Sequence, residues 1–371
     1  MTNNNESKVL NVPNLRFPEF QGEWKKCKLG DLCNVLMCKR ILASQTNTEG
    51  GVPFYKIGTI GSTPDAYISK ELFDDYKAKY NYPHKGEVMI TCAGTVGKCV
   101  IYNGKDAYYQ DSNIVWIDNP SQYISNGFLY HLLAKVDWRK LNSTTIIRIY
   151  NDDLRNLKLI YPQIEEQQKI SRLLSLLDER IATQNKIIDK LQSLIKGIAQ
   201  KIVCSNKSNV RLSECVECSS STLQESDVYE HGAYPVYGAN GIVGYLDNYN
   251  TEGKAVYIIK DGSGVGNVSY VTGKCSATGT LNTLQAKDGY SLQYLYYLLK
   301  VFNFEPYKTG MAIPHIYFKD YGKAKIFCPS YTEQLQYARL LSAIESKLSS
   351  EQNIKTNLTL QKQYLLRQMF I

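Results

Sequence analysis

Apolar residues recur in alternating steps of three and four along one long segment of the chain. From residue 165 to 203 there is no proline, and only Gly197 interrupts the helix formers. This is the heptad pattern of a coiled coil, whereas a helix inside a globular core usually carries a wider apolar face. At 1.5 Å per residue, a helix of about 38 residues is about 57 Å long, which is the length of a strut. The predicted seam consists of Ile170, Leu174, Leu177, Ile181, Ile188, Leu191, Ile195, Ile198 and Ile202, with Gln184 as its polar member.

A second segment with the same periodicity spans residues 332–371. It places Glu351, Lys355 and Lys362 where apolar residues would continue the seam. The second helix is therefore the weaker coiled-coil former, and we expect it to pair with the first helix of the same chain. Pairing between two chains is the alternative. The apolar seam of this segment contains Tyr337, Leu341, Ile344, Leu348, Leu358, Leu365 and Met369.

The two helical segments belong to an internal repeat, and such self-similarity indicates a duplicated architecture. The block that starts at Pro162 recurs at Pro329 (329 − 162 = 167), and both copies run through Glu-Gln to Arg-Leu-Leu-Ser at the same spacing. Upstream the offset is larger, because Pro53 corresponds to Pro235 (235 − 53 = 182). Helical blocks in constant register beside globular parts of changing length predict a fixed helical frame that carries two divergent modules.

The modules that precede the helices have the texture of small mixed domains. Short β-type runs, broken by Gly, Asn and Asp, fill residues 29–162 and 212–329. Each module also has a glycine-containing turn between two strands, at Gly94–Gly97 and at Gly262–Gly266. The predicted strands are residues 88–91, 98–102, 114–117, 255–259 and 268–271.

Both modules end in the same way. A Leu-Tyr-x-Leu-Leu helix recurs (294 − 128 = 166), and Ile149-Tyr150 recurs as Ile316-Tyr317 (316 − 149 = 167). The predicted fold class is α+β: two similar globular α/β domains separated by two long antiparallel coiled-coil helices, in a pseudo-twofold internal repeat. The predicted segments are an N-terminal arm at 1–27, a first globular domain at 28–162, a central long helix at 163–205, a second globular domain at 206–329 and a C-terminal long helix at 330–371.

Length and composition agree with this division. A chain of 371 residues is too long for one ordinary core and suits two domains with connectors. The excess of 43 basic over 35 acidic residues gives a net charge of +8, which favours an anionic partner without requiring one. No run of eighteen apolar residues occurs, and the first residues lack the apolar core of an export signal. We therefore expect a cytoplasmic protein.

Metal and disulfide chemistry is not expected. The ten cysteines do not recur at matching repeat positions, as a duplicated disulfide framework would, so they are expected to be free thiols in a reducing compartment. Cys215 and Cys218 form a C-x-x-C pair that has no second pair and no histidine at finger spacing. A zinc site is therefore not predicted.

Catalytic motifs are equally weak. The turn at Gly262–Gly266 continues into a strand, whereas a dinucleotide fingerprint needs a helix there. The segment Asn81-Tyr82-Pro83-His84 is faintly similar to the Asn-Pro-Pro-aromatic motif of adenine methyltransferases, but it lacks the double proline and an accompanying glycine-rich loop. No acid pair and no nucleophile with a base recurs in both modules. The chain is predicted to be a binder rather than a catalyst.

Polar residues in the modules suit nucleic-acid binding. Arg and Lys can engage phosphates or guanine edges, while Thr, Asn and Tyr donate to phosphates or pack on thymine methyl groups. Taken singly, each of these residues also fits an ordinary solvated surface. The candidate DNA-binding residues are Lys39, Arg40, Lys98, Arg139, Lys140, Thr144, Thr145, Arg148, Lys260, Lys308, Thr309 and Lys319.

Nearly the whole chain resembles one family, the specificity subunits of type I restriction-modification systems. The marks are Leu15-Arg16-Phe17-Pro18-Glu19-Phe20 with Trp24, then Lys28-Leu29-Gly30-Asp31-Leu32, the phrase from Pro162 to Ile170, and the long helix after each module. The doubled Pro-x-x-x-Glu-Gln block with Arg-Leu-Leu is specific, whereas the glycine turns are not. The second copy departs from the phrase at Tyr331-Thr332 but keeps Glu333-Gln334.

The resemblance implies a non-catalytic subunit whose two modules are target recognition domains. Each would read one half of a bipartite, asymmetric DNA target, and the helices would fix the spacer and dock the partners. The implied partners are double-stranded DNA, two modification (methyltransferase) subunits and two restriction (translocase and nuclease) subunits. No cofactor is implied in this chain; adenosylmethionine, ATP and magnesium would be bound by the partner subunits.

Two other classes of function remain open at this point. One is a coiled-coil scaffold whose paired modules bind protein or RNA without reading a DNA sequence. The other is an enzyme with an unrecognised site, which the missing recurrent polar cluster disfavours. DNA binding that discriminates between sequences separates the first of these from a recognition subunit.

Overall fold

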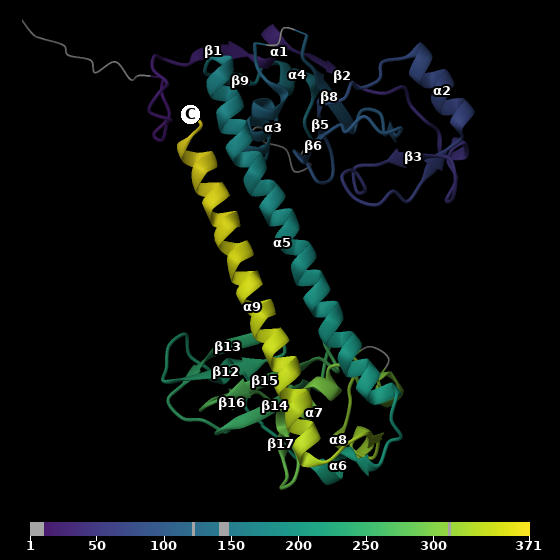
Figure 1. Cartoon of the computed structure of the whole chain (residues 1–371), viewed down its shortest axis with the longest axis vertical. Coiled ribbons are helices and arrows are strands. Elements are labelled where there is room, and N and C mark those ends of the chain that lie inside the picture. The colour runs from purple at the N-terminus through teal and green to yellow at the C-terminus, as the bar shows by residue number, and fades with distance from the viewer. Residues whose placement is uncertain (1–10, 121–122, 141–147, 311–312) are drawn as a thin grey trace, which may run out of the picture. The chain divides into compact units, whose positions relative to one another are not determined.

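The computed structural model describes residues 11–120, 123–140, 148–310 and 313–371. These residues form two compact units (Figure 1). Unit 1 comprises the chain up to Thr183 together with Thr356–Ile371, and unit 2 comprises Gln184–Lys355. Each unit therefore contains one globular module and a part of each long helix.

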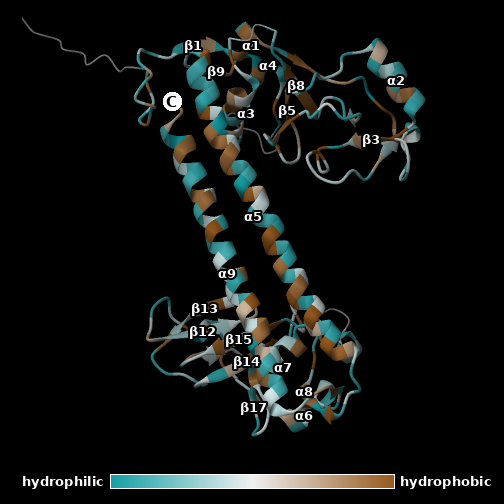
Figure 2. Ribbon diagram, viewed as in Figure 1, coloured by the Kyte–Doolittle hydropathy of each residue, from teal (hydrophilic) through white to brown (hydrophobic). Residues whose placement is uncertain are grey.

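The two long helices are the elements that the heptad pattern predicted. Helix α5 spans Ile164–Cys204 and helix α9 spans Tyr331–Gln368. Figure 2 shows hydrophobic residues recurring along both helices between hydrophilic ones. In each unit the segment of α5 packs against the segment of α9 that runs in the opposite direction (Figure 1), so the pairing occurs within one chain.

Polar residues in the seam pair with one another. In unit 2 the Gln184 amide donates to the Glu351 carboxylate and, at 3.2 Å, to the Glu351 carbonyl oxygen. These two residues hold the same repeat position (351 − 184 = 167), and both are nearly buried. In unit 1 the Lys362 ammonium donates to Asp178. Two of the polar interruptions of the α9 seam therefore have partners on α5.

The repeated Glu-Gln block anchors each long helix to its module. The Gln167 amide accepts from the backbone N–H of Ser125 at 2.7 Å and donates to the Pro162 carbonyl at 2.8 Å. In unit 2, Gln334 accepts from the backbone N–H of Ser291 at 2.9 Å and donates to its own proline carbonyl at 2.9 Å. The two serines are the N-caps of α3, Asn126–Lys135, and α7, Leu292–Leu299, so in each unit a single glutamine ties together the N-terminal ends of two helices.

The module of unit 1 is built on a four-stranded antiparallel sheet in the order β2-β8-β5-β6. All four residues of the continuous apolar run Val88–Thr91 are buried, as a central strand requires. A three-stranded sheet, β4-β3-β7, and a two-stranded pair, β1-β9, complete the module. The elements are β1 Lys25–Lys28, α1 Leu29–Leu32, β2 Asn34–Leu36, η1 Ala43–Gln45, β3 Val52–Tyr55, β4 Tyr67–Ile68, α2 Lys70–Lys79, β5 Val88–Thr91, β6 Cys99–Ile101, β7 Tyr108–Tyr109, β8 Ile114–Asp118, α3 Asn126–Lys135, α4 Asn151–Arg155 and β9 Lys158–Tyr161.

Two apolar cores stabilise unit 1. One lies where α3 and the first turns of α5 meet the end of α9, and it includes Phe128, Leu174 and Phe370. The other includes Phe73, on α2, and Trp116, on β8. Each of these large side chains is at most 5% exposed, which at about 25 cal/mol per Å² makes them major contributors to stability.

Unit 2 repeats this topology. Its four-stranded sheet has the order β11-β17-β14-β15, its three-stranded sheet has the order β13-β12-β16, and its two-stranded pair is β10-β18. When β10 to β18 are matched in chain order with β1 to β9, each sheet of unit 2 has the same strand order as its counterpart in unit 1. The elements are β10 Val210–Arg211, α6 Leu212–Cys215, β11 Val216–Ser220, η2 Glu225–Asp227, β12 Tyr234–Gly238, β13 Gly241–Leu246, β14 Lys254–Ile259, β15 Val268–Thr272, β16 Ser276–Ala277, β17 Leu281–Ala286, α7 Leu292–Leu299, η3 Glu305–Tyr307, α8 Phe318–Tyr321 and β18 Lys325–Ile326.

The main difference between the modules is α2, which occupies Lys70–Lys79 between β4 and β5. Unit 2 passes directly from β13 to β14 without a helix. This insertion explains why the repeat offset falls by 15 residues, from 182 at Pro53 to 167 at Pro162. The α+β class and the duplication predicted from the sequence are confirmed, whereas α2 was not predicted.

Candidate nucleic-acid interface

The glycine turn has the same packing in both modules. Gly97, at φ +81°, lies against Trp138, and a Cβ atom there would approach the Trp138 Cδ1 atom to 2.1 Å. Gly266, at φ +92°, lies against Phe304, and its Cβ atom would lie 3.1 Å from the Phe304 Cβ. The two aromatic residues hold equivalent repeat positions (304 − 138 = 166). Glycine is needed at both places because of the positive φ and the close aromatic ring.

Backbone hydrogen bonds fix the strand end that leads into this turn. In unit 1 the Cys92 N–H donates to the Asn113 carbonyl at 2.8 Å, and the Cys92 carbonyl accepts from the Ile149 N–H at 2.9 Å. These bonds join three segments that are far apart in the sequence. We call this arrangement the backbone frame.

Unit 2 has the same backbone frame. The Lys260 N–H donates to the Thr280 carbonyl at 2.9 Å, and the Lys260 carbonyl accepts from the Ile316 N–H at 2.9 Å. Thr280 corresponds to Asn113 and Ile316 to Ile149, both at an offset of 167. The geometry is therefore shared, while a buried thiol in one module is replaced by a partly exposed ammonium group in the other.

Three of the predicted cations gather beside the frame in unit 1. Lys39 and Arg40 line a hollow of about 440 Å³ together with Asp111. The Arg148 guanidinium donates to the carbonyl of the next residue, Ser112, at 3.3 Å. Residues 39–40 and residue 148 are more than one hundred positions apart in the chain. Both lie beside the loop between β7 and β8, which contains Asp111 and Ser112.

The other predicted DNA-binding residues of unit 1 have different surroundings. Arg139 is exposed and directly follows Trp138, which contacts the glycine turn. Lys98 donates to the Ile60 carbonyl at 2.5 Å, so its ammonium group is held by unit 1 itself. Lys140 pairs with Asp137 at 3.4 Å, but its side chain is 83% exposed, so this is a weak surface ion pair. Thr144 and Thr145 lie outside the described residues.

Unit 2 brings its predicted residues together around the corresponding turn. The Lys260 ammonium lies 3.9 Å from the Asp261 carboxylate. Thr309 and His315 form an isolated β-bridge, in which the backbone N–H of each residue donates to the carbonyl of the other. Lys319 is exposed in the short helix α8, not in a loop as expected. The ammonium group of a further candidate, Lys308, is paired with Glu305 at 2.6 Å.

The sequence reasoning missed one pair in this group. The His315 Nδ1 atom lies 2.6 Å from the Asp261 Oδ1 atom, in the middle of the predicted cations. A signal was present, because His315 holds the repeat position of Arg148 (315 − 148 = 167). Asp261 can accept a hydrogen bond from a cytosine amino group, so this turn is not suited to phosphates alone.

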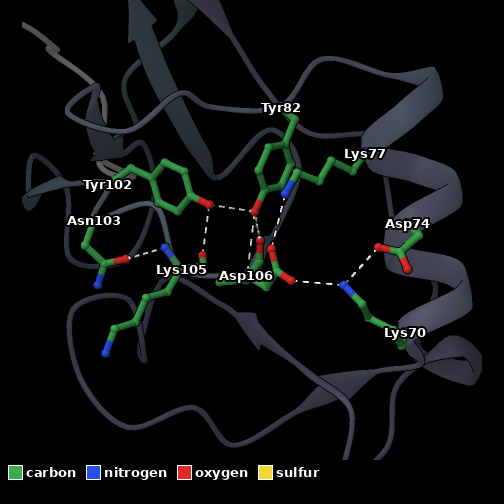
Figure 3. Close-up of polar contacts among 9 residues, drawn as sticks. Lys70, Asp74, Lys77, Tyr82, Tyr102, Asn103, Lys105 and Asp106 are labelled. Carbon is green, nitrogen blue, oxygen red and sulfur yellow. Dashed lines mark hydrogen bonds and ion pairs between the residues drawn. The ribbon is translucent and has the colours of Figure 1, made fainter.

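A polar network attaches α2 to the rest of unit 1 (Figure 3). Asp106 accepts hydrogen bonds from Lys70 at 3.0 Å and Lys77 at 3.2 Å, and Lys70 also pairs with Asp74 at 2.9 Å. Hydrogen bonds from the two lysines hold the pKa of Asp106 below its ordinary value, and those to Asp74 and Asp106 raise the pKa of Lys70. The ion pairs of these lysines therefore lie within the unit.

The segment with a faint similarity to a methyltransferase motif has a packing role. The Tyr82 hydroxyl donates to the Ala107 carbonyl at 2.7 Å and lies 3.0 Å from the Tyr102 hydroxyl (Figure 3). Burial, followed by the bond to Tyr102, raises the pKa of Tyr82 far above its ordinary value. A neutral, internally bonded phenol at this position supports the module rather than a reaction.

The predicted seam residues are buried to different degrees. On α5 six of the nine apolar seam residues are buried, whereas two of the seven in the second segment are buried: Leu341 and Met369, the latter directly after the end of α9. Burial is thus greater on the helix that has the stronger apolar pattern. The buried seam residues are Ile170, Leu174, Leu177, Ile188, Ile195, Ile202, Leu341 and Met369; the partly buried ones are Ile181, Leu191, Ile198, Tyr337, Ile344, Leu348, Leu358 and Leu365.

The described residues contain no group of three or more His, Cys, Asp or Glu side chains arranged to hold a metal ion. All ten cysteines are free thiols; the Cys215 sulfur lies 3.9 Å from that of Cys328, not near Cys218. Within the described part of the chain, no helix has the length and apolarity needed to cross a bilayer.

Two α+β modules with the same backbone frame, each attached to long paired helices, define an internally duplicated α+β protein. A family model for the type I restriction modification DNA specificity domain matches this chain twice, at residues 21–193 and 205–360. The chain belongs to this family.

Relatives and solved structures agree with this assignment. A Haemophilus influenzae protein provisionally named as a type I restriction enzyme specificity subunit is 44% identical over 189 residues, which are 51% of this chain and 46% of the relative. The Escherichia coli type I restriction enzyme EcoprrI specificity subunit is 26% identical over 117 residues, 32% of this chain and 29% of the relative. The chain thus matches about half the length, or less, of these curated relatives.

The fold is also found in a solved structure. The S subunit of a type I restriction-modification system from M. genitalium matches with a TM-score of 0.69 at 19% identity, covering 97% of this chain and 99% of that chain. At this level of identity the match shows the fold.

Proposed function

We propose that this chain is the non-catalytic DNA sequence-recognition subunit of a type I restriction-modification complex. The observation that carries the proposal is the common backbone frame with different side chains on it. At equivalent positions unit 1 has Arg148 and unit 2 has His315, and unit 2 has the partly exposed Lys260 ammonium group where unit 1 buries the Cys92 thiol. Different hydrogen-bonding groups held in the same geometry suit two readers of different DNA sequences.

In this proposal each module binds one half of a bipartite, asymmetric target, and the paired helices fix the spacing between the halves. Two rigidly spaced readers select half-site separation geometrically, as a dimeric repressor does. Since the readers differ, the target is not palindromic. Contacts of Lys and Arg with phosphates supply affinity that falls steeply with salt, and contacts in the grooves supply the sequence.

The proposed partners follow from the family. Two modification subunits bind adenosylmethionine and methylate adenine, and two restriction subunits use ATP and magnesium to translocate and cut DNA. The long helices are the proposed docking elements, and the assembly works in the cytoplasm. This chain holds no cofactor in the proposal, and purified alone it neither methylates nor cleaves DNA.

Module exchange tests the division of labour. The modification complex is produced with this chain, or with a chimera that carries residues 28–162 of another family member, and methylated adenines are mapped across the host genome. One half of the methylated motif should change while the other half and the gap stay constant. Changes in both halves would contradict separate readers, and methylation without any motif would favour a scaffold that does not read DNA sequence.

A pair of lysines at the two ends of one strand provides a test at residue level. Lys260 directly follows strand β14 and is part of the backbone frame, whereas Lys254 is the first residue of β14, at its other end. Lys260→Gln should weaken binding of the modification complex to the target duplex. The logarithm of the association constant should also fall less steeply with the logarithm of the salt concentration, by about 1 in slope. Lys254→Gln serves as the matched control. Equal effects of both substitutions would place the DNA elsewhere.

A further inference from the structure

An exposed tyrosine stands at the same repeat position in both modules. Tyr150 is 60% exposed and Tyr317 is 48% exposed, although most tyrosines of the modules are buried or partly buried. Each directly follows the isoleucine whose N–H completes the backbone frame. The backbone that carries each tyrosine is therefore held beside the strand end that leads into the glycine turn of its module.

A cation lies over each of these rings, but it comes from a different residue in each module. The Arg148 guanidinium carbon lies 5.9 Å from the centroid of the Tyr150 ring. The Lys319 ammonium lies 5.3 Å from the centroid of the Tyr317 ring. One cation precedes its tyrosine by two residues and the other follows by two, so the pairing of a phenol with a positive charge is retained while the sequence around it has changed.

We propose that Tyr150 and Tyr317, each with its neighbouring cation, bind DNA phosphates, one in each half-site. A phenolic O–H and a cation side by side offer two donors to one anionic group, and hydrogen bonds to charged acceptors are the stronger kind. This inference rests on the proposed function and assigns the contacts that do not depend on sequence.

The duplication favours a phosphate over a base as the ligand. The phosphate backbone is the same in every sequence, so a contact with it can be identical in two modules that read different halves. Side chains that the modules do not share, such as Asp261 and His315 of unit 2, suit the bases instead. Shared tyrosines on otherwise divergent surfaces therefore correspond to the part of the ligand that the two half-sites share.

Removing the hydroxyl groups tests the proposal in the intact modification complex. Tyr150→Phe and Tyr317→Phe are compared with Tyr123→Phe and Tyr229→Phe, which alter similarly exposed tyrosines, 64% and 68%, outside the frame. The probes are a duplex with the methylated motif and a shuffled duplex. Each frame substitution should weaken binding to both probes by the same factor, about 5-fold, and leave the methylated motif unchanged. The control substitutions should leave binding unaltered.

A neutral backbone provides the second measurement. Methylphosphonate groups are placed singly along the motif duplex, so that one phosphate at a time loses its charge. At one position in each half-site, the parent complex and its Phe variant should then bind the duplex with the same affinity. A loss confined to the motif duplex would show a base contact and overturn the proposal. Weaker assembly with the modification subunits in the absence of DNA would identify a protein contact and also overturn it. Failure of the parent complex to distinguish the two probes would instead contradict the proposed function.

Discussion

Units 1 and 2 carry an acidic residue at the same position of their long helix, but a lysine reaches it from a different direction. The acids are Asp178 and Glu345 (345 − 178 = 167). In unit 1 the lysine is Lys362, on α9, whereas in unit 2 it is Lys300, which directly follows α7 and lies 3.0 Å from the carboxylate. Ile195 holds the repeat position of Lys362 (362 − 195 = 167). The duplication has thus kept the ion pair and changed its donor, which shows that the pairing itself matters.

The aromatic neighbours of this pair differ too. In unit 2 the Tyr297 hydroxyl donates to Glu345 at 2.7 Å. Burial alone would raise the pKa of Glu345, but hydrogen bonds from Tyr297 and Lys300 outweigh it and hold the pKa below its ordinary value. In unit 1 the position of Tyr297 is taken by His131 (297 − 131 = 166). Burial, followed by the positive charge of Lys362, lowers the pKa of His131 to about 4.

The largest effects are expected where the units agree. Leu174 and Leu341 hold equivalent positions (341 − 174 = 167) and are 0% and 1% exposed. Each Leu→Ala substitution should lower the free energy of unfolding of its own unit by about 3 to 4 kcal/mol, because it leaves a cavity in a tight core. Hydrogen exchange measured in α3, which belongs to unit 1, and in α7, which belongs to unit 2, shows which unit each substitution destabilises. Leu176→Ala and Leu340→Ala, at sites 40% and 50% exposed, are the controls; equal losses there would refute the argument.

The next effect separates the units by pH. Because the pKa of His131 is lowered on folding from 6.5 to about 4, the unfolded chain binds the proton more readily, and unit 1 loses stability as the pH falls below about 6.5. The loss should reach about 2 kcal/mol at pH 5 and about 3 kcal/mol at pH 4. His131→Phe should abolish this contribution. Urea unfolding at pH 7.5 and pH 5, followed by hydrogen exchange in α3, tests it; an unchanged pH dependence in the variant would contradict the assignment.

A smaller difference concerns the two acids. Glu345→Gln should destabilise unit 2 by about 2 kcal/mol, because it weakens bonds from Lys300 and two tyrosines. Asp178→Asn should cost about 1 kcal/mol, because Asp178 bonds mainly to Lys362 and lacks the two tyrosine donors, while the two carboxylates are similarly exposed, 35% and 33%. Denaturant midpoints of both variants measure the comparison. A greater loss for Asp178→Asn would reverse our ranking of the two networks.

The smallest effect is expected at the polar position of the seam. Gln184→Ala should cost about 1 kcal/mol, since it removes one hydrogen-bonded amide from a partly polar contact. A double-mutant cycle with Glu351→Ala isolates the pairing energy, because the two residues contact each other directly. Strictly additive losses would show that the pair contributes nothing to the helix contact.

The features that could be predicted from the sequence are those that follow a period or a repeat. The heptad steps placed α5 and α9 to within three residues, and the continuous apolar run of Val88–Thr91 placed a central strand. Helix α2 was missed because its only fully buried residue is Phe73, which leaves no apolar face to detect.

The candidate interface was predicted less completely. Residue type alone pointed to Lys39 and Arg40, which do lie together beside the frame. It could not show that Lys98 is held by its own unit, because the bond to the Ile60 carbonyl depends on the tertiary fold. The pair His315 and Asp261 was missed for the same reason.

The backbone frame has a consequence for how such proteins change over generations. Its hydrogen bonds run between main-chain groups, which are alike for a cysteine in one module and a lysine in the other. The side chain at this strand end can therefore differ between the modules while the main-chain bonds beneath it stay the same. In unit 1 the Cys92 thiol is buried in the core, whereas in unit 2 the Lys260 ammonium group is partly exposed, so a change of ligand chemistry at this point also requires a change in the packing around it.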